Sequence, residues 1–252
     1  MDDHILLELT RELKLDGLRE TLLSRLAEAR EHNLPYEEFL GLLLQDEKQV
    51  KAAKNLATRL SQAKFEEDKT IAGFDLKRYL PEIKRLVLHL TSGAYLLEKK
   101  NVLILGPTGT GKTHLAEALG HEACRKGKKV KFIRTNQLMV EFQASKADDS
   151  TESVLTKYAK TDLLILDDFG LKAFTHAQAC DLYELIARKH IKSSFIITSN
   201  RKTENWLELF PDPVMANAAL DRIVHNSFCV ILEGESYRKN FTPKLPKEDC
   251  KK

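Results

Sequence analysis

The sequence lacks the features of membrane and secreted proteins. Within its 252 residues no apolar run approaches the roughly 18 residues that a membrane-spanning helix needs. The acidic start, MDDHILLELT, has neither the basic residues nor the cleavage site of a signal peptide. Four cysteines, Cys124, Cys180, Cys229 and Cys250, show no C-x-x-C spacing, which predicts free thiols rather than a disulfide frame or a zinc site. We therefore expect a cytoplasmic protein with no membrane partner.

The sequence also lacks a strong excess of charge of one sign. It has 40 lysine and arginine residues against 37 aspartate and glutamate residues, so the formal net charge is only +3. A surface that binds nucleic acid would therefore be local. Two short basic stretches, residues 51–64 and 124–134, are candidates, although runs of this length are as often an ordinary solvated surface. The candidate DNA-binding residues are Lys51, Lys54, Arg59, Lys64, Lys128, Lys129 and Lys131.

Neither basic stretch carries a motif that reads bases. A zinc finger, a recognition motif and a series of stacking aromatic residues are all missing from the sequence. Positive side chains contact phosphates without base readout, and such contacts weaken as salt rises. Any DNA binding is therefore expected to tolerate different sequences and to be sensitive to salt.

The chain changes character near residue 95. Before it, strand-like alternation is missing, and DGLRETLLSRLAEAREHN has leucines at helical spacing with Asn33 as the expected stop. Pro35 is expected to open one long helix. The predicted divisions are a helical N-terminal domain (1–70), a linker or docking segment (71–95), an α/β domain (96–240) and a basic tail (241–252).

Five β-rich runs alternate with helical segments after residue 100. The runs are NVLIL, VKFIR, LLILDD, SSFIITS and FCVILE. Strands and helices that alternate at this spacing indicate a parallel sheet covered by helices on both faces. The expected fold class is therefore a three-layer α/β domain preceded by a small all-α domain.

A glycine-rich loop follows the first of these runs. Residues 106–113 read GPTGTGKT and match G-x-x-x-x-G-K-[ST] at every fixed position. The backbone N–H groups of such a loop and the start of the next helix form a nest for phosphate oxygens. Lys112 is expected to reach the β and γ phosphates of a nucleotide, and Thr113 to hold Mg²⁺. The candidate nucleotide-binding residues are Gly106, Pro107, Thr108, Gly109, Thr110, Gly111, Lys112, Thr113 and His114.

Two carboxylates end the run LLILDD. Asp167 comes at the carboxyl end of the expected strand, where ligands gather in parallel sheets, and is expected to hold Mg²⁺. Asp168 follows directly and could orient or deprotonate the attacking water. The alternative is a turn at the strand end in which both residues cap helices, a role that aspartate favours.

Three later residues are further candidates for this chemistry. Asn200 follows the run SSFIITS, where it could contact the γ phosphate or the attacking water, or simply cap the strand. Arg222 lies late in a helical segment, and Arg238 lies past the last β-rich run. A guanidinium placed on the γ phosphate favours phosphoryl transfer, although a single arginine is usually a solvated surface side chain.

Together these motifs resemble the AAA+ ATPases, and most closely the IstB-like transposition helpers, whose near relatives are the DnaC-type helicase loaders. The resemblance covers essentially the whole chain and rests on GPTGTGKTHLA, DLLILDDFG, IITSNR, the Trp206 segment, AALDR and GESYR. It implies a sheet order of 5-1-4-3-2. The implied roles are Walker A for Lys112 and Thr113, Walker B for Asp167 and Asp168, sensor 1 for Asn200, arginine finger for Arg222 and sensor 2 for Arg238.

The resemblance also implies cofactors and partners. ATP and Mg²⁺ are the expected cofactors, and an arginine finger acting on a neighbour implies a homo-oligomer with nucleotide at its subunit interfaces. Proteins of the IstB-like group assemble on double-stranded target DNA and deliver it to a partner transposase in the bacterial cytoplasm. An assembly of this head-to-tail kind makes a ring if it closes and a helical filament if it does not.

The sequence departs from the common AAA+ pattern in two places. Most members carry Asp-Glu where this chain has Asp167 and Asp168, and a carboxylate one methylene shorter predicts slow hydrolysis that serves as a timed switch. The usual helical lid is missing, since only 14 residues follow Arg238, so the adenine side is open to neighbouring segments.

Other functions remain open at this point. A helicase loader that holds single-stranded DNA is the main alternative. A small-molecule kinase would need an acceptor pocket and a closing lid, and neither is evident in the sequence. The last alternative is a nucleotide-gated scaffold that never hydrolyses ATP. Only an assay of ATP hydrolysis would distinguish it from the leading prediction.

Overall fold

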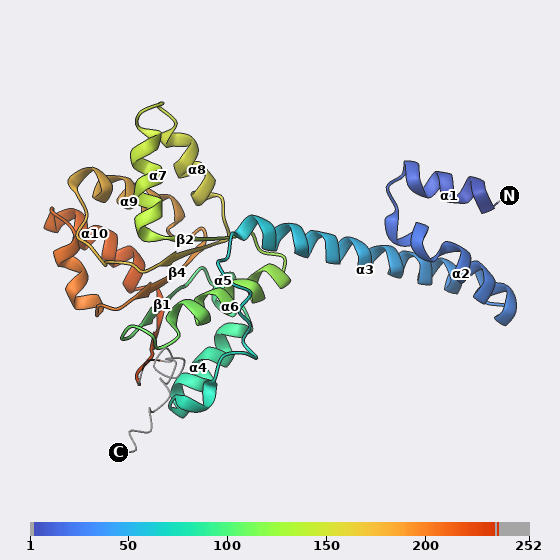
Figure 1. The fold of residues 1–252 in the computed structure, drawn as a ribbon, viewed down its shortest axis with the longest axis horizontal. Coiled ribbons are helices and arrows are strands. Elements are labelled where there is room, and N and C mark those ends of the chain that lie inside the picture. The colour runs from blue at the N-terminus through green and yellow to red at the C-terminus, as the bar shows by residue number, and fades with distance from the viewer. Residues whose placement is uncertain (1–2, 235, 237–252) are drawn as a thin grey trace, which may run out of the picture. The chain divides into compact units, whose positions relative to one another are not determined.

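The chain divides into two compact units, which meet in sequence at Arg59 and Leu60. The computed structural model describes residues 3–234 and 236 (Figure 1). Within this described part, no helix combines the length and the apolar character needed to cross a membrane. The division falls inside a helix and differs from the predicted boundary at residue 70, so the predicted ranges 1–70, 71–95 and 96–240 stay predictions. The predicted tail, 241–252, lies outside the described residues.

The first unit is built from helices α1 (Asp3–Glu12), α2 (Asp16–His32) and the first part of α3 (Tyr36–Ala63). Helix α2 ends where the sequence predicted, because Asn33 adopts the left-handed conformation (φ 49°) and its N–H donates to the carbonyl of Ala29. Because Gly17 has no Cβ atom, α2 can approach the backbone of α3 closely at Glu47. The predicted N-terminal helical region is thus confirmed.

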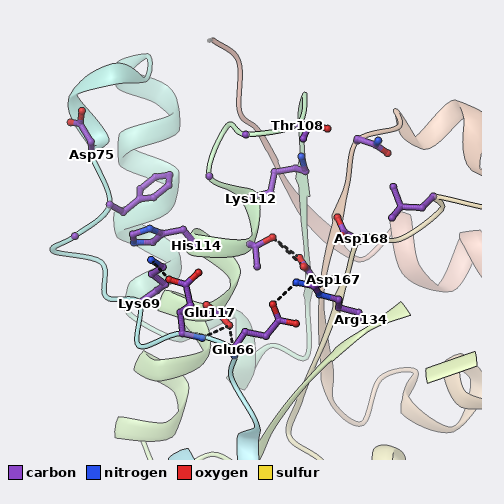
Figure 2. Close-up of a pocket in the computed structure, with 18 residues that line it drawn as sticks. Glu66, Lys69, Asp75, Thr108, Lys112, His114, Glu117, Arg134, Asp167 and Asp168 are labelled. Atoms are coloured by element: carbon purple, nitrogen blue, oxygen red, sulfur yellow. Dashed lines mark hydrogen bonds and ion pairs between the residues drawn. The ribbon is translucent and has the colours of Figure 1, made fainter. Parts of the chain in front are cut away.

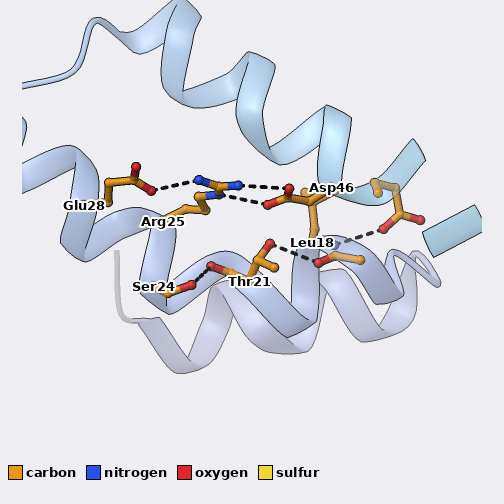
Figure 3. A network of polar contacts seen from close by, with 8 residues as sticks. Leu18, Thr21, Ser24, Arg25, Glu28 and Asp46 are labelled. Atoms are coloured by element: carbon orange, nitrogen blue, oxygen red, sulfur yellow. Dashed lines mark hydrogen bonds and ion pairs between the residues drawn. The ribbon is translucent and has the colours of Figure 1, made fainter. Parts of the chain in front are cut away.

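Polar contacts join α2 to α3 inside this first unit. The Arg25 guanidinium donates from Nε and Nη2 to both carboxylate oxygens of Asp46, at 2.9 and 3.1 Å (Figure 3). The backbone N–H of Leu18 donates to Glu47 at 3.0 Å. Bidentate pairing of this kind fixes direction as well as distance, so it sets how the two helices meet.

Five parallel strands form the sheet of the second unit. They are β1 (Asn101–Leu105), β2 (Val130–Arg134), β3 (Leu163–Asp167), β4 (Ser194–Ser199) and β5 (Ser227–Ile231). Their order is β2-β3-β4-β1-β5, and all four pairings are parallel. Read from the other edge, this is the predicted order, and the predicted α/β class is confirmed.

Helices cover both faces of this sheet (Figure 1). Helices α4 (Pro81–Thr91) and α6 (Lys112–Arg125) pack on one face, with the short α5 (Ala94–Leu97) beside them. The other face carries α7 (Thr135–Ser145), α8 (Thr151–Ala159), α9 (His176–Lys189) and α10 (Pro213–Val224). Two 3-10 helices, η1 (Leu76–Arg78) and η2 (Thr203–Leu209), complete the unit.

The main hydrophobic core lies between the sheet and helices α7 to α10. Leu164 and Phe142 are fully buried there, as expected for strands and helices that meet face to face. Trp206 of η2 is also fully buried and packs on Phe169 with ring centroids 4.7 Å apart. This core holds the carboxyl ends of β1, β3 and β4 at one edge, where the candidate site lies.

Candidate nucleotide-binding site

The glycine-rich loop leaves β1 through a backbone conformation that requires glycine. Gly106 has φ 153°, and its N–H donates to the carbonyl of Ser199 on the neighbouring strand at 3.2 Å. A Cβ atom at this position would collide with the carbonyl oxygen of Leu232. Gly111 has φ 88° and caps the N-terminus of α6. The loop therefore stays close to the sheet edge and turns directly into the helix, which is the geometry of a phosphate nest.

Lys112 is the first residue of α6 and is held inside this loop. Its side chain is almost fully buried, and Nζ donates to the carbonyl of Pro107 at 2.9 Å. The ammonium group and the positive end of the helix dipole therefore face the same small space. This concentrates positive charge where the sequence placed the β and γ phosphates.

Thr113 of α6 and Asp167 at the end of β3 are in contact. Figure 2 shows Asp167 beside Asp168 in the cavity. The Thr113 hydroxyl donates to the Asp167 carboxylate at 3.0 and 3.1 Å, and the Thr198 hydroxyl donates to it at 2.6 Å. Burial raises the pKa of Asp167, and these two hydroxyl groups act against that rise. Hard oxygen ligands at this spacing fit Mg²⁺, which favours carboxylates and hydroxyls near phosphate. The donor set therefore fits the predicted metal site.

Asp168 reaches the same pocket although successive strand residues point to opposite faces. It lies just past the end of β3 and adopts the left-handed conformation, with φ 55°. Its backbone N–H donates to the Thr198 hydroxyl at 2.9 Å. The turn thus brings two consecutive carboxylates to one cavity. The sequence placed both there but gave no sign of this backbone conformation.

Asn200 also lines the cavity, but it is exposed, whereas Thr198 is fully buried beside Asp167. Asn200 is the residue that the sequence named as a candidate contact to the γ phosphate or the attacking water. Because Thr198 joins the side chain of Asp167 to the backbone of Asp168, it organises the carboxylate pair. A threonine two residues before Asn200, facing the same edge, was the signal available in the sequence.

The cavity has a volume of about 660 Å³, and one wall comes from a segment that the sequence analysis divided between domain and linker. In this wall the rings of Phe74 and Tyr79 stack with centroids 5.3 Å apart and nearly parallel. The Tyr79 hydroxyl donates to the carbonyl of Thr110 in the loop at 2.7 Å. His114 lies 5.5 Å from the Phe74 ring and contacts the carbonyl of Thr70 at 3.1 Å.

Arg134 and Glu66 form a second part of the cavity wall. The sequence placed Arg134 in the basic stretch 124–134 and did not single out Glu66. Arg134 ends β2 and pairs in register with Asp167 of β3. Its guanidinium donates to Glu66 at 2.5 Å. A basic residue that ends one strand beside an acidic residue that ends the next was the only signal in the sequence.

Of the two predicted arginines, Arg222 stands apart from this cavity. Arg222 lies on α10, where its guanidinium is 4.9 Å from the centre of the Tyr183 ring, and it does not line the cavity of its own chain. Arg238 lies outside the described residues. Ser236 lies directly over Gly109, so the chain after β5 returns to the glycine-rich loop.

The candidate DNA-binding lysines belong to both units and differ in their surroundings. Lys51 pairs with Glu47 at 3.1 Å, and Lys54 pairs with Asp16. Lys131 donates to the carbonyl of Gln62 at 3.1 Å, and burial lowers its pKa. The remaining predicted positions are Arg59, Lys64, Lys128 and Lys129.

Comparison with known sequences points to one family. Residues 8–244 match the family described as IstB-like ATP binding protein. An ATP-binding protein in an insertion sequence of Mycobacterium tuberculosis is 39% identical over 235 residues, covering 92% of this chain and 93% of that protein. The ATP-binding protein of insertion sequence IS21 from Pseudomonas aeruginosa is 36% identical over 236 residues, covering 93% and 89%.

Comparison with solved structures agrees on the fold. The crystal structure of the DnaC helicase loader superposes with a TM-score of 0.52 at 19% identity, covering 62% of this chain and 94% of that one. Domain III of the replication initiation protein DnaA from Thermotoga maritima gives 0.57 at 20% identity, covering 67% and 68%. At these identities the likeness concerns the AAA+ P-loop fold alone. From its sequence match over residues 8–244, the chain belongs to the family of IstB-like ATP-binding proteins.

Proposed function

We propose that this protein is an ATP-dependent helper of transposition, which assembles on duplex target DNA and delivers it to a partner transposase. The observation that carries the proposal is the contact between Thr113 and Asp167 at the mouth of a glycine-rich loop. The naming of its relatives as ATP-binding proteins of insertion sequences supports the transposition role. We place its action in the bacterial cytoplasm.

The chemistry proposed for the site is ATP hydrolysis. The backbone of residues 106–113 and Lys112 bind the phosphates, and Thr113 and Asp167 would hold Mg²⁺, which supplies neutralising charge when bound. Asp168 accepts a proton from water while the water oxygen bonds to the γ phosphorus. The bond to the β-phosphate oxygen breaks, which leaves ADP and phosphate. Asn200 orients the water, and Arg238 contacts the γ phosphate of the ATP bound to its own subunit.

The base of the nucleotide would lie toward the wall formed by residues 69–79. Phe74 and His114 offer flat surfaces there, and the hydrogen bond from Tyr79 to Thr110 holds this wall to the phosphate loop. Aromatic faces stack on nucleobases without sequence-specific hydrogen bonds. This segment would cover the base of the nucleotide, as a helical lid does in other AAA+ proteins.

Hydrolysis is proposed to be slow, because the Asp168 carboxylate is one methylene shorter than the glutamate common at this position. A misplacement of roughly 1 Å can cost on the order of 100-fold in rate. Asp168→Glu should therefore speed single-turnover hydrolysis. An unchanged rate would contradict the proposal of a timed switch.

Arg222 is proposed to act on the nucleotide of a neighbouring subunit. Its place outside the cavity of its own chain supports an action in trans. Binding of ATP should then favour a head-to-tail assembly. Light scattering with a saturating non-hydrolysable ATP analogue tests this, and a monomer under those conditions would contradict it.

The experiment that tests the whole proposal is DNA binding with and without a non-hydrolysable ATP analogue, at two salt concentrations. Strong nucleotide-dependent binding of duplex DNA in large assemblies would support the transposition helper. A preference for single-stranded DNA would instead favour a helicase loader. Failure to bind DNA in either state would overturn both and leave a nucleotide switch.

A further inference from the structure

One ion pair connects the carboxylate pair of the site to the segment that follows α3. Arg134 ends β2, directly beside Asp167 in the sheet register, and donates to Glu66. Figure 2 shows the Arg134 guanidinium with Glu66 on one side and Asp167 close by on the other. Arg134, Glu66, Asp167 and Asp168 all line the same cavity. The Arg134 guanidinium therefore shares this cavity with the carboxylates of Glu66, Asp167 and Asp168.

Glu66 is fixed in place by contacts of its own backbone. The buried carboxylate of Glu117 on α6 accepts the N–H of Glu66 at 2.8 Å and the N–H of Glu67 at 3.3 Å. Phe65 stacks on His121 of the same helix with ring centroids 4.2 Å apart. The segment is thus attached to the helix that begins with Lys112. The Glu66 side chain is held where it meets Arg134.

The guanidinium interacts with the site carboxylates as well as with Glu66. Glu66 is the principal cause of the raised pKa of Arg134, and the charges of Asp167 and Asp168 add to it. Burial raises the pKa of Asp167, and the charge of Arg134 acts against that rise. A planar guanidinium has five N–H donors and readily forms bidentate pairs with a carboxylate. Asp167 and Asp168 line the same cavity as Arg134, so without Glu66 their carboxylates are available partners for those donors.

We propose that Glu66 is a positioning residue that acts through Arg134. By holding the guanidinium, Glu66 keeps Arg134 from pairing with Asp168, and Asp168 retains the lone pair that accepts a proton from water. In a bidentate pair with arginine both oxygens of a carboxylate are occupied, so neither is turned toward a water molecule. This proposal rests on the proposed hydrolysis at the same site.

A double-substitution cycle in the full-length protein tests the proposal. Glu66→Gln should lower the single-turnover rate of ATP hydrolysis about tenfold, a modest part of what general base catalysis contributes. The affinity for a non-hydrolysable ATP analogue should change by less than about threefold, because the phosphate loop is untouched. In the Arg134→Gln background, Glu66→Gln should have no further effect on the rate.

The matched control is Glu122→Gln, on α6. Glu122 pairs with Arg125 in the same way, but neither residue lines the cavity. This control should leave the rate unchanged, and circular dichroism should give the same helix content for all four variants. An unchanged rate in Glu66→Gln, or losses that simply add in the double variant, would overturn the positioning role alone. Failure of the unsubstituted protein to hydrolyse ATP would overturn the proposed hydrolysis together with it.

Discussion

The two compact units of this chain bury their apolar side chains to very different extents. Among the described residues of the first unit, Leu22 and Leu43 are the buried large apolar side chains. Ile5, Leu40 and Leu44 are each at least half exposed there. The second unit has a continuous core between the sheet and helices α7 to α10. The α/β unit therefore carries its own stability, whereas the helical unit relies on a few contacts such as Arg25 with Asp46.

The largest expected effect on this comparison is the loss of a core side chain. Leu164→Ala in β3 should destabilise the second unit by about 3 kcal/mol, because it opens a cavity in a fully packed core. The matched change Leu40→Ala in α3, where the side chain is 54% exposed, should alter stability by less than about 0.5 kcal/mol. Urea unfolding followed by circular dichroism measures both. Equal losses would mean that Leu40 is covered in solution.

The next effect concerns nucleotide binding, which we propose for the cavity of the second unit. Lys112→Ala should weaken ATP binding about 100-fold, since it removes a preorganised cation from the phosphate site. ATP with Mg²⁺ should then no longer raise the unfolding temperature, because ligand stabilisation follows occupancy. Lys126→Ala, at the opposite end of α6, is the control and should keep the full shift in differential scanning fluorimetry.

The third effect concerns the pH dependence of stability. It comes from a buried lysine of the second unit, whereas the ion pairs of the first unit are solvated. Lys189 is fully buried, and burial lowers its pKa to about 7 from the ordinary 10.5. The unfolded chain still binds the proton between these values, so unfolding takes up a proton and stability should rise with pH across this window. The rise from pH 7 to pH 9 should be about 2 kcal/mol.

Lys189→Met should remove this rise, which urea unfolding at several pH values would measure. The control Lys157→Met changes a lysine that is half exposed and pairs with Glu141, and it should keep the slope of the unsubstituted protein. If Lys189→Met kept the slope as well, another group would be responsible. The two hydrogen bonds from Lys189 to Thr161 favour its charged form, so the slope also measures how far burial outweighs them.

The smallest expected effect is on DNA binding. Substitution of Lys128 and Lys129 by alanine should reduce the slope of log affinity against log salt by about two units, since two phosphate contacts are lost. The matched pair Lys51 and Lys54 should change it less, because each already has a carboxylate partner. Fluorescence anisotropy with one duplex at several salt concentrations measures both slopes. A larger change for Lys51 and Lys54 would move the DNA surface to the first unit.

Much of the fold could be predicted from the sequence because its signals are local. The run of apolar residues in each strand, the end of α2 at Asn33 and the start of α6 at Lys112 depend on neighbours within a few residues. The glycine-rich loop and the two aspartates at the end of β3, Asp167 and Asp168, were likewise found from short motifs. Their places at one sheet edge follow from parallel strands, whose carboxyl ends meet at that edge.

Other parts of the site depend on residues far apart in the chain. Tyr79 donates to Thr110, Glu117 accepts from Glu66, and Arg134 pairs with Glu66 across 68 positions of sequence. Periodicity and motifs carry no information about such pairs. The sequence therefore assigned residues 66–75 to a domain end and a linker, although six of them line the cavity.

The sequence by itself determined the α/β class, the family and the identity of the phosphate loop, because each rests on residues adjacent in the chain. Only the tertiary structure decided that Thr198 joins the two aspartates at the end of β3 and that Glu66 pairs with Arg134. Burial of Asp167, the left-handed turn at Asp168 and the closure of the 66–79 segment are results of packing. Packing acts between surfaces that come together only after the strands have aligned.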